Sequence, residues 1–279
     1  MSLGAAQIGF DLHHLTLRSP SPERLAGFYG TAMDMKIERV SDLEWRCAGP
    51  DRKLGIVEGP ANTLARAAYT CRGKEALSEF RAHVERQDVA VTSADNAYFD
   101  DGCFAVSDPD GNEIVFGVAE PDASQFNGIA GALQHVVFAS FNVEAFRSFY
   151  CDKLGFSLTD RVLHDDGSLA TCFFTSNHEH HTLACFLADR QGIDHHCYEA
   201  GEWNYIRDWC DHFADQDIPL VWGPGRHGPG NNLFAFVNDP DGNWVEVSAE
   251  LETVRGRPVK DWPQSERTLN LWGNGVLRS

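Results

Sequence analysis

The chain is built from two similar halves. LHHLTL in the first half resembles LQHVVF in the second, which matches His14 with His135 at an offset of 121 residues (135 minus 14). The pair FY recurs at the same offset (149 minus 28), and the motif DPDGN begins at Asp108 and again at Asp239, at an offset of 131 (239 minus 108). Matches that keep their order while the offset grows slowly indicate a duplicated domain with small loop insertions. The chain therefore has to fold as two copies of one unit.

Each copy has the pattern of a strand, a helix and several strands, repeated once. In the second copy, QHVVFASF alternates like a half-buried strand, and VEAFRSFYCDKLGF and WNYIRDWCDHFADQ carry apolar residues at helical spacing. LFAFVND and WVEVSAE predict a closing hairpin across the DPDGN turn. We predict an α+β fold with domains at residues 1–121 and 122–279, joined near the linker PDASQFNGIAG and followed by a tail after residue 250.

The composition limits the class of protein. Hydrophobic residues make up 43% and charged residues 23% of the 279 residues, which is typical of a folded globular protein. The net charge of −18 would repel phosphate backbones and anionic membranes, so we expect no nucleic-acid or membrane partner. The N-terminus lacks a signal-peptide pattern and no segment approaches the roughly 18 apolar residues of a membrane span, so we expect a cytoplasmic protein. The eight cysteines include no C-x-x-C pair and are expected to be reduced.

Three polar residues of the second copy lie inside apolar strand patterns. They are His135, His196 and Glu246. Burying an imidazole, and especially a carboxylate, costs several kcal/mol unless a partner compensates for it. Two histidines and one carboxylate form the ligand set of non-haem Fe(II) sites, which leave metal positions open for substrate. A surface-facing Glu246 is the alternative, because its strand neighbours Val245 and Val247 point to the opposite face.

The first copy has kept only one of these residue types. His14 matches His135, but Ala67 stands opposite His196 (196 minus 129) and Val115 opposite Glu246 (246 minus 131). Glu113 offers a carboxylate displaced by two residues, without a second histidine beside it. We therefore expect the first copy to be structural and the second to carry the chemistry.

Other histidines concentrate in the same half, and five of the twelve lie between residues 177 and 200. His195 precedes His196 in an extended stretch and is expected to face the other way. Because His180 and His181 also alternate, only one of them can enter a cavity. His227 lies in the loop GPGRHGPGNN, where a solvated histidine is the alternative to a functional one.

Five motifs, taken in order, resemble those of the type I extradiol catechol dioxygenases of the vicinal oxygen chelate superfamily, which is glyoxalase- and bleomycin-resistance-like. They are LQHVVF, HHTLA, IDHHCYE, GRHGPGNNLFAF and DPDGNWVEV, and the resemblance covers roughly residues 8 to 260. It implies four βαβββ modules that form two tandem incomplete barrels, with the metal in the C-terminal one. It also implies a homo-oligomer, since relatives often assemble.

The resemblance also implies roles for individual residues. His135, His196 and Glu246 would bind Fe(II), with Mn(II) as the less common occupant. His181 falls on the acid–base histidine of the family, and His180 would take its place beside the substrate if the register were shifted by one.

The substrates implied are a catecholic aromatic, mono- or bicyclic, and O2, which would be converted to a ring-opened product. His227 would contact the substrate oxygens. Phe236 stands where the family commonly has a tyrosine, and a lost hydrogen bond to a charged oxygen is worth about 1.5–3 kcal/mol, so the substrate choice could differ.

Two other functions stay open at this point. Another metal-dependent member of the superfamily, such as an isomerase or a lyase, would usually build its site from both copies, which the missing ligands of the first copy disfavour. A metal-free protein that binds or sequesters aromatic compounds would not need all three ligand types, although Phe236 is compatible with it.

Overall fold

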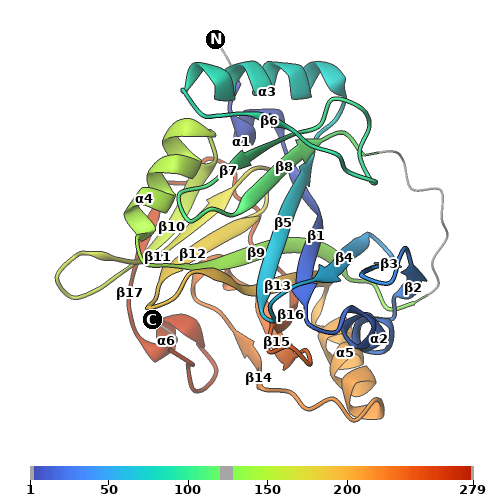
Figure 1. The fold of residues 1–279 in the computed structure, drawn as a ribbon. Helices are drawn as coiled ribbons and strands as arrows, with labels where there is room; N and C mark the ends of the chain where they lie inside the picture. The colour runs from blue at the N-terminus through green and yellow to red at the C-terminus, as the bar shows by residue number, and fades with distance from the viewer. Residues whose placement is uncertain (1–2, 120–127, 278–279) are drawn as a thin grey trace.

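A computed structural model describes residues 3–119 and 128–277, which form two mixed sheets with helices on their outer faces (Figure 1). The domain boundary predicted between residues 121 and 122 lies outside the described residues, as does most of the predicted linker. The order strand, helix and three strands occurs four times along the chain. The α+β fold class and the four βαβββ modules predicted from the sequence are therefore confirmed.

The first half contains two βαβββ modules after a short N-terminal helix. Its elements are α1 (Ala5–Ile8), β1 (Asp11–Ser19), α2 (Pro22–Ala32), β2 (Lys36–Arg39), β3 (Glu44–Gly49), β4 (Arg52–Glu58), β5 (Thr63–Thr70), α3 (Lys74–Arg86), β6 (Thr92–Ser93), β7 (Phe104–Ser107) and β8 (Glu113–Gly117).

The second half repeats this order and adds a tail. Its elements are β9 (Ala132–Ser140), α4 (Val143–Ser148), which a π-helical turn continues (Phe149–Lys153), β10 (Ser157–Leu163), β11 (Leu169–Thr175), β12 (Leu183–Leu187), β13 (Gly192–Gly201), α5 (Trp203–Asp215), β14 (Trp222–Arg226), a 3-10 turn (Pro229–Asn231), β15 (Leu233–Asn238), β16 (Trp244–Ala249), β17 (Lys260–Pro263) and α6 (Glu266–Leu269).

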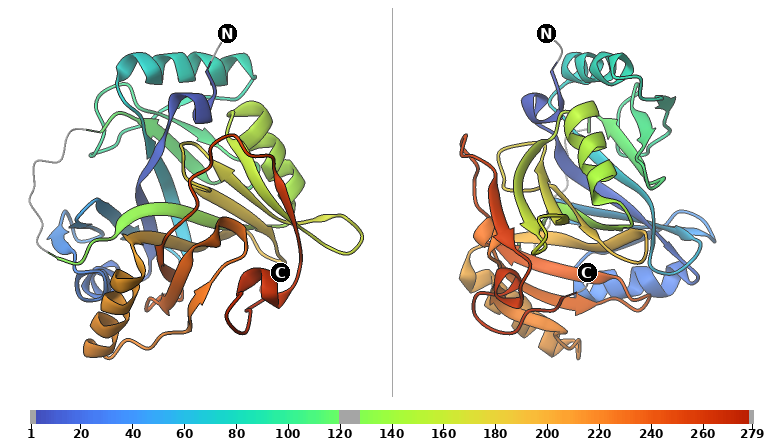
Figure 2. Two further views of the ribbon diagram at one scale, coloured as in Figure 1. Left: turned by 180° about the vertical axis from the view of Figure 1, so that it is seen from behind. Right: turned by 90° about the vertical axis from the view of Figure 1, so that its left-hand side faces the viewer.

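The two sheets have the same strand order. The first is β2-β3-β4-β1-β5-β8-β7-β6 and the second, from its tail side, is β17-β10-β11-β12-β9-β13-β16-β15-β14. Adding eight to each strand number of the first sheet gives the second, apart from β17. The tail strand β17 pairs in parallel with β10 and extends the second sheet, as the view from behind shows (Figure 2).

The repeated FY and DPDGN motifs contact each other across the two halves. The Tyr29 hydroxyl donates to Asp239 Oδ2 at 2.9 Å, and the Tyr150 hydroxyl donates to Asp108 Oδ2 at 3.2 Å. Each aspartate also accepts two backbone N–H groups of its own turn. Burial, foremost, raises the pKa of both tyrosines well above the ordinary value, so they stay protonated donors. The motifs recur because each half supplies one buried donor and one buried acceptor to the other.

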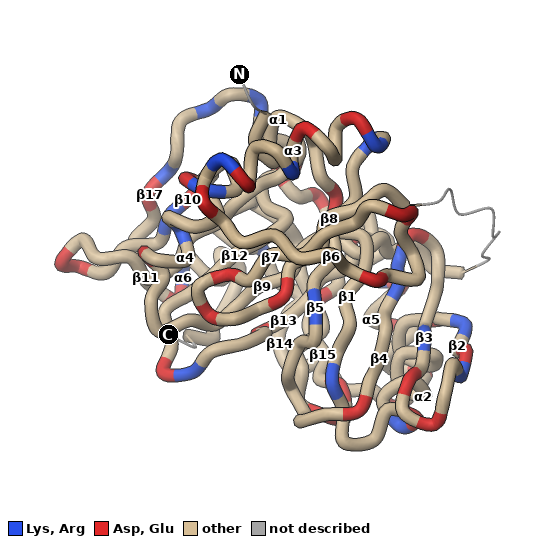
Figure 3. Tube along the Cα trace, turned by 45° about the horizontal axis from the view of Figure 1, so that its top comes forward, with Lys and Arg blue, Asp and Glu red and all other residues tan. Residues whose placement is uncertain are grey.

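Helices cover the outer faces of the sheets. Helix α2 packs on β3 and β4 and helix α5 on β15 and β16. The two helices lie side by side, and His212 Nε2 of α5 donates to the Thr31 carbonyl at 3.0 Å (Figure 1). Acidic and basic residues lie mainly along the outer loops and helices of both halves (Figure 3). Within residues 3–119 and 128–277, no helix has the length and apolar character needed to cross a membrane.

Removing the Tyr29 hydroxyl, which donates to Asp239, should destabilise the protein. In Tyr29→Phe the buried Asp239 loses a donor, so we expect urea denaturation to give a free energy of unfolding about 1–3 kcal/mol lower than wild type. Tyr205 is 43% exposed, and Tyr205→Phe should change that free energy by less than about 0.5 kcal/mol. Equal effects of the two substitutions would contradict the structural role of the Tyr29 contact.

Candidate metal and substrate site

Three side chains from adjacent strands converge in the second half. His135 lies on β9, His195 on β13 and Glu246 on β16, and these strands are neighbours in the sheet. The Nε2 atoms of His135 and His195 lie 3.2 Å and 3.3 Å from the same carboxylate oxygen, Glu246 Oε2. All three residues are buried. Two imidazole nitrogens and a carboxylate oxygen are therefore gathered around one point.

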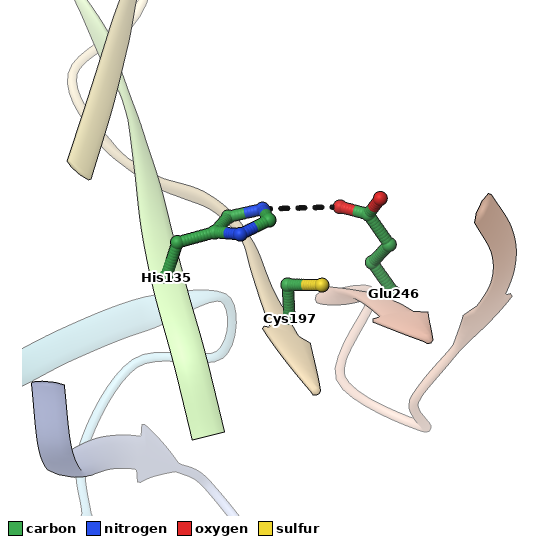
Figure 4. A group of neighbouring side chains, drawn as sticks. All are labelled: His135, Cys197 and Glu246. Atoms are coloured by element: carbon green, nitrogen blue, oxygen red, sulfur yellow. Dashed lines mark hydrogen bonds and ion pairs between the residues drawn. The ribbon is translucent and has the colours of Figure 1, made fainter. Parts of the chain in front are cut away.

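Strand register explains this convergence. Cys197 of β13 pairs with His135 on one side and with Glu246 on the other, so these three residues lie in a row on one face of the sheet (Figure 4). His195, two residues earlier on β13, shares that face. The Cys197 sulfur also lies within 4.8 Å of the nearest ligand atoms of His135 and Glu246.

Cys197 is not positioned as a ligand for a metal that also binds substrate. Burial, foremost, raises the pKa of its thiol well above the ordinary value, whereas the thiolate is the metal-binding form. Cys197 is also absent from the walls of the adjacent cavity, on which His135, His195 and Glu246 all lie. The thiol therefore lies in the same row as His135 and Glu246 but does not line the cavity.

Neighbouring acceptors fix how the two imidazoles are oriented. His195 Nδ1 donates to Asp194 Oδ2 at 2.7 Å, and His135 Nδ1 donates to Gln134 Oε1 at 3.3 Å. Because these oxygens only accept, a neutral ring turns its Nε2 lone pair toward the Glu246 carboxylate. Lone pairs facing an anion repel, so a cation has to lie between them, either as protons on Nε2 or as a metal. The donor set and its carboxylate and amide partners fit a divalent metal.

The pKa shifts of Glu246 and His195 agree with a shared cation, whereas burial lowers the pKa of His135 and favours its neutral ring. Burial alone would raise the pKa of Glu246, but contacts with the imidazoles of His135, His195 and His227 outweigh it and hold that pKa well below the usual range. Burial alone would likewise lower the pKa of His195, but its bonds to Asp194 and Glu246 raise it. Glu246 is thus an ionised carboxylate in the interior and is compensated by the histidines around it.

The three side chains line one end of a cavity of about 100 Å³. His181, His227 and Phe236, which the sequence placed at the site, line it as well. The His181 ring lies 4.2 Å from the His135 ring, centroid to centroid. The pKa of His181 is well below the ordinary value, mainly because the ring is buried, so the ring is neutral.

His180 does not lie on the cavity wall. Its ring lies behind His181, where its Nδ1 is 2.9 Å from His181 Nδ1 and its Nε2 is 3.2 Å from Asp160 Oδ2. Asp160 also accepts from Trp262 Nε1 at 2.7 Å and pairs with Arg257 at 2.7 Å. The prediction that His180 contacts substrate is therefore corrected, because its ring lies between His181 and Asp160 and is not part of the cavity lining.

The C-terminal tail holds His227. His227 Nδ1 donates to the Leu269 carbonyl, and its Nε2 lies 3.7 Å from Glu246 Oε1. The ring stacks on Phe234 at 4.0 Å. Asn232 Nδ2, 3.3 Å from Glu246 Oε1, supplies a further donor at this end of the cavity. Sequence reasoning missed Asn232 and the tail contacts, because the tail is distant in sequence from the residues it holds.

The prediction of His196 as a ligand is wrong in this structure. Its side chain faces the other side of β13, where Nε2 lies 3.2 Å from the Tyr29 hydroxyl, and burial lowers its pKa to about 3. A one-residue error in register exchanges the two faces of a strand. Both faces of β13 are buried and a bulge lies between Ile193 and His195, so the hydrophobic pattern gave no register. The available signal was Asp194, because a ligating imidazole commonly donates its other N–H to a carboxylate.

Among residues 3–119, the first half shows no equivalent group of metal donors. His14, Ala68 and Val115 form the row that corresponds to His135, Cys197 and Glu246. Arg66, two residues before Ala68, takes the place of His195. The Asn96 amide donates to His14 Nε2 at 2.9 Å, so that lone pair is already used. A cation and an apolar side chain stand where the second half has an imidazole and a carboxylate.

Comparison with known proteins agrees with this fold. The family model of the Glyoxalase/Bleomycin resistance protein/Dioxygenase superfamily matches residues 11–116 and again residues 132–247. The chain therefore belongs to this superfamily and contains two copies of its domain. The two matched segments correspond to the two sheets.

Individual relatives within the superfamily are ring-cleaving dioxygenases. Metapyrocatechase 2 of Cupriavidus necator is 26% identical over 222 residues, which cover 68% of each chain. An iron-dependent extradiol dioxygenase of Rhodococcus jostii (strain RHA1) is 27% identical over 248 residues, covering 80% of this chain and 81% of that protein. The crystal structure of homoprotocatechuate 2,3-dioxygenase from Arthrobacter globiformis superposes with a TM-score of 0.84 at 18% identity and covers 99% of this chain and 91% of that one.

The adjacent residues His195 and His196 provide a matched test of this site. We expect His195→Ala to weaken Fe(II) binding by about 100-fold or more, because one of three donors is lost. His196→Ala should bind Fe(II) like wild type and lower only the free energy of unfolding, because His196 contacts Tyr29 on the other face. Anaerobic titration against a coloured chelator measures the affinity. The reverse result would move the site to the other face of β13.

Proposed function

We propose that this protein is an extradiol dioxygenase that cleaves a catecholic ring with O2 at an Fe(II) held by His135, His195 and Glu246. The observation that carries the proposal is the approach of both imidazole Nε2 atoms to one buried carboxylate oxygen at the end of a cavity. Three protein donors would leave about three coordination positions of the metal open for substrate and O2. The similarity to an iron-dependent extradiol dioxygenase supports iron over Mn(II).

Bound iron would supply Lewis acidity for the two catechol oxygens and redox capacity for the transfer of electron density from the ring to O2. The protein supplies the position and the environment. The sheet fixes His135, His195 and Glu246 on one face, where they line the same cavity as Val137 and Phe236. Holding both reactants at one point provides much of the rate of such a reaction.

His181 is the proposed acid–base residue. His180 Nε2 lies 3.2 Å from Asp160 Oδ2, and the negative charge of this carboxylate favours a proton on that nitrogen. When His180 is neutral, its Nδ1 then accepts from His181 Nδ1, which leaves the lone pair of His181 on Nε2. A neutral imidazole with a free Nε2 beside the metal donors can accept a proton from a catechol hydroxyl and later return it.

His227 and Phe236 complete the proposed substrate site. Because His227 Nδ1 donates to Leu269, a neutral His227 keeps its Nε2 as an acceptor for a substrate hydroxyl. Phe236 pairs with Glu246 in the strand register and its ring packs 5.3 Å from that of His195. It contributes an apolar surface and no hydroxyl, so the hydrogen bonds to substrate oxygens fall to His181 and His227.

A direct assay tests the proposed function. Anaerobically loaded protein should contain about one iron per chain, because one half holds the full donor set. We expect it to consume O2 with catechol and to give a yellow ring-opened product, whereas Glu246→Ala should lose both iron and activity. Iron-loaded protein that takes up no O2 with any catechol would contradict the proposed reaction.

The contacts from Asp160 through His180 to His181 should affect kcat. We expect His181→Phe to lower kcat by about 10²- to 10⁴-fold, as removal of a general base does. His180→Phe should lower kcat by about 10- to 100-fold, because His181 loses the contact that orients its proton. The exposed His178 of the same segment provides the control, and His178→Phe should match wild type. Fe(II) affinity should be unchanged in all three, and an unchanged kcat in His180→Phe would contradict the orienting role.

A further inference from the structure

The cavity wall beyond the proposed metal donors consists of apolar rows. Val137 on β9 pairs with Ala184 on β12, which pairs with Phe173 on β11. In the next row, Phe186 pairs with Thr171. Since strands rise about 3.3 Å per residue, these two rows lie about 7 Å apart along the sheet. A substituent on a ring bound at His135 therefore extends over these side chains.

A second apolar part of the lining comes from β14 and the tail. It is formed by Trp222, Leu269 and Val276. Trp222 Nε1 donates to the Asn274 carbonyl at 3.0 Å, which fixes the tail against β14. A substituent on the ring thus contacts apolar side chains of the cavity lining.

Among residues 3–119 and 128–277, no lysine or arginine that could pair with a substrate carboxylate lines the cavity. Glu246 is the only Asp, Glu, Lys or Arg among the described residues of its lining. Arg226, next to His227 in sequence, pairs with Glu250 at 2.7 Å. Arg257 pairs with Asp160 at 2.7 Å and with Glu252 at 2.6 Å. A carboxylate on the substrate would be buried beside Glu246 without a partner, in a chain of net charge −18.

We infer, on the basis of the proposed function, that the substrate is a catechol whose ring carries a neutral, apolar alkyl or aryl substituent. Catechols that carry a carboxylate are rejected at binding. Phe173, Phe186 and Trp222 select the substituent by burying its surface, and the missing cation excludes the charged analogue.

Two ligands of nearly equal size test this inference. In both compounds a CH2 group is attached to the ring. It carries a methyl group in 4-ethylcatechol and a carboxylate in 3,4-dihydroxyphenylacetate. Anaerobic calorimetric titration of the iron-loaded, full-length protein with each should give a dissociation constant about 100-fold larger for the carboxylate. Equal binding, or tighter binding of the carboxylate, would overturn the inference.

O2 uptake measured in parallel keeps this inference separate from the proposed function. Selective binding of 4-ethylcatechol without O2 uptake would overturn the dioxygenase proposal and still support the substrate class. O2 uptake combined with equal binding of the two ligands would support the dioxygenase proposal and overturn the substrate class.

A substitution in the wall provides a second test. Thr171 is half-buried and faces the cavity, so an arginine can be placed there with its head group near the substituent. We expect Thr171→Arg to narrow the difference between the two dissociation constants by about 10-fold, because the carboxylate gains a partner. Thr171→Leu is the uncharged control, because leucine and arginine have similar bulk near the backbone. It should leave the preference for 4-ethylcatechol intact. Folding of both variants is checked by circular dichroism, and an unchanged ratio in folded Thr171→Arg would overturn the role of charge at this wall.

Discussion

Burial of the Glu246 carboxylate is the constraint on which the site depends. A buried anion costs several kcal/mol unless a cation compensates for it, and Glu246 is 1% exposed. The compensation comes from His135 and His195, whose outer nitrogens are already committed to Gln134 and Asp194. The inner nitrogens then share one space with the carboxylate, and a divalent metal fills such a space without leaving a lone pair against an anion. The same arrangement that stabilises the interior therefore prepares a metal site.

The duplicated scaffold places this site by a symmetric exchange of contacts. Tyr29 binds the turn of the second half and Tyr150 the turn of the first, so each copy stabilises the other. The symmetry ends at the cavity face of the central strands. There the first half has Arg66 and Val115 in place of an imidazole and a carboxylate. The duplication thus fixes the framework, and a few substitutions on one face decide which half can bind a metal.

Much of this architecture was predictable from the sequence, because repeated motifs constrain topology directly. The repeat of strands and helices in each copy and the burial of His135 and Glu246 in apolar strands follow from the sequence pattern. The four modules and the entry of His181 and His227 into the cavity were implied by the resemblance of the motifs to those of the extradiol dioxygenases. The choice between His195 and His196 did not follow. β13 is buried on both faces and interrupted by bulges, so alternation carries no information about register there. The contact of His180 with Asp160 depends on pairing between distant strands, which no local pattern encodes.

The most direct test of the metal centre is anomalous diffraction at the iron absorption edge from crystals of the anaerobically loaded protein. The account predicts one peak in each chain within bonding distance of His135 Nε2, His195 Nε2 and a carboxylate oxygen of Glu246, open toward the cavity between Phe173 and Phe236. A peak bonded to the Cys197 sulfur, or one on the His196 side of β13, would contradict it.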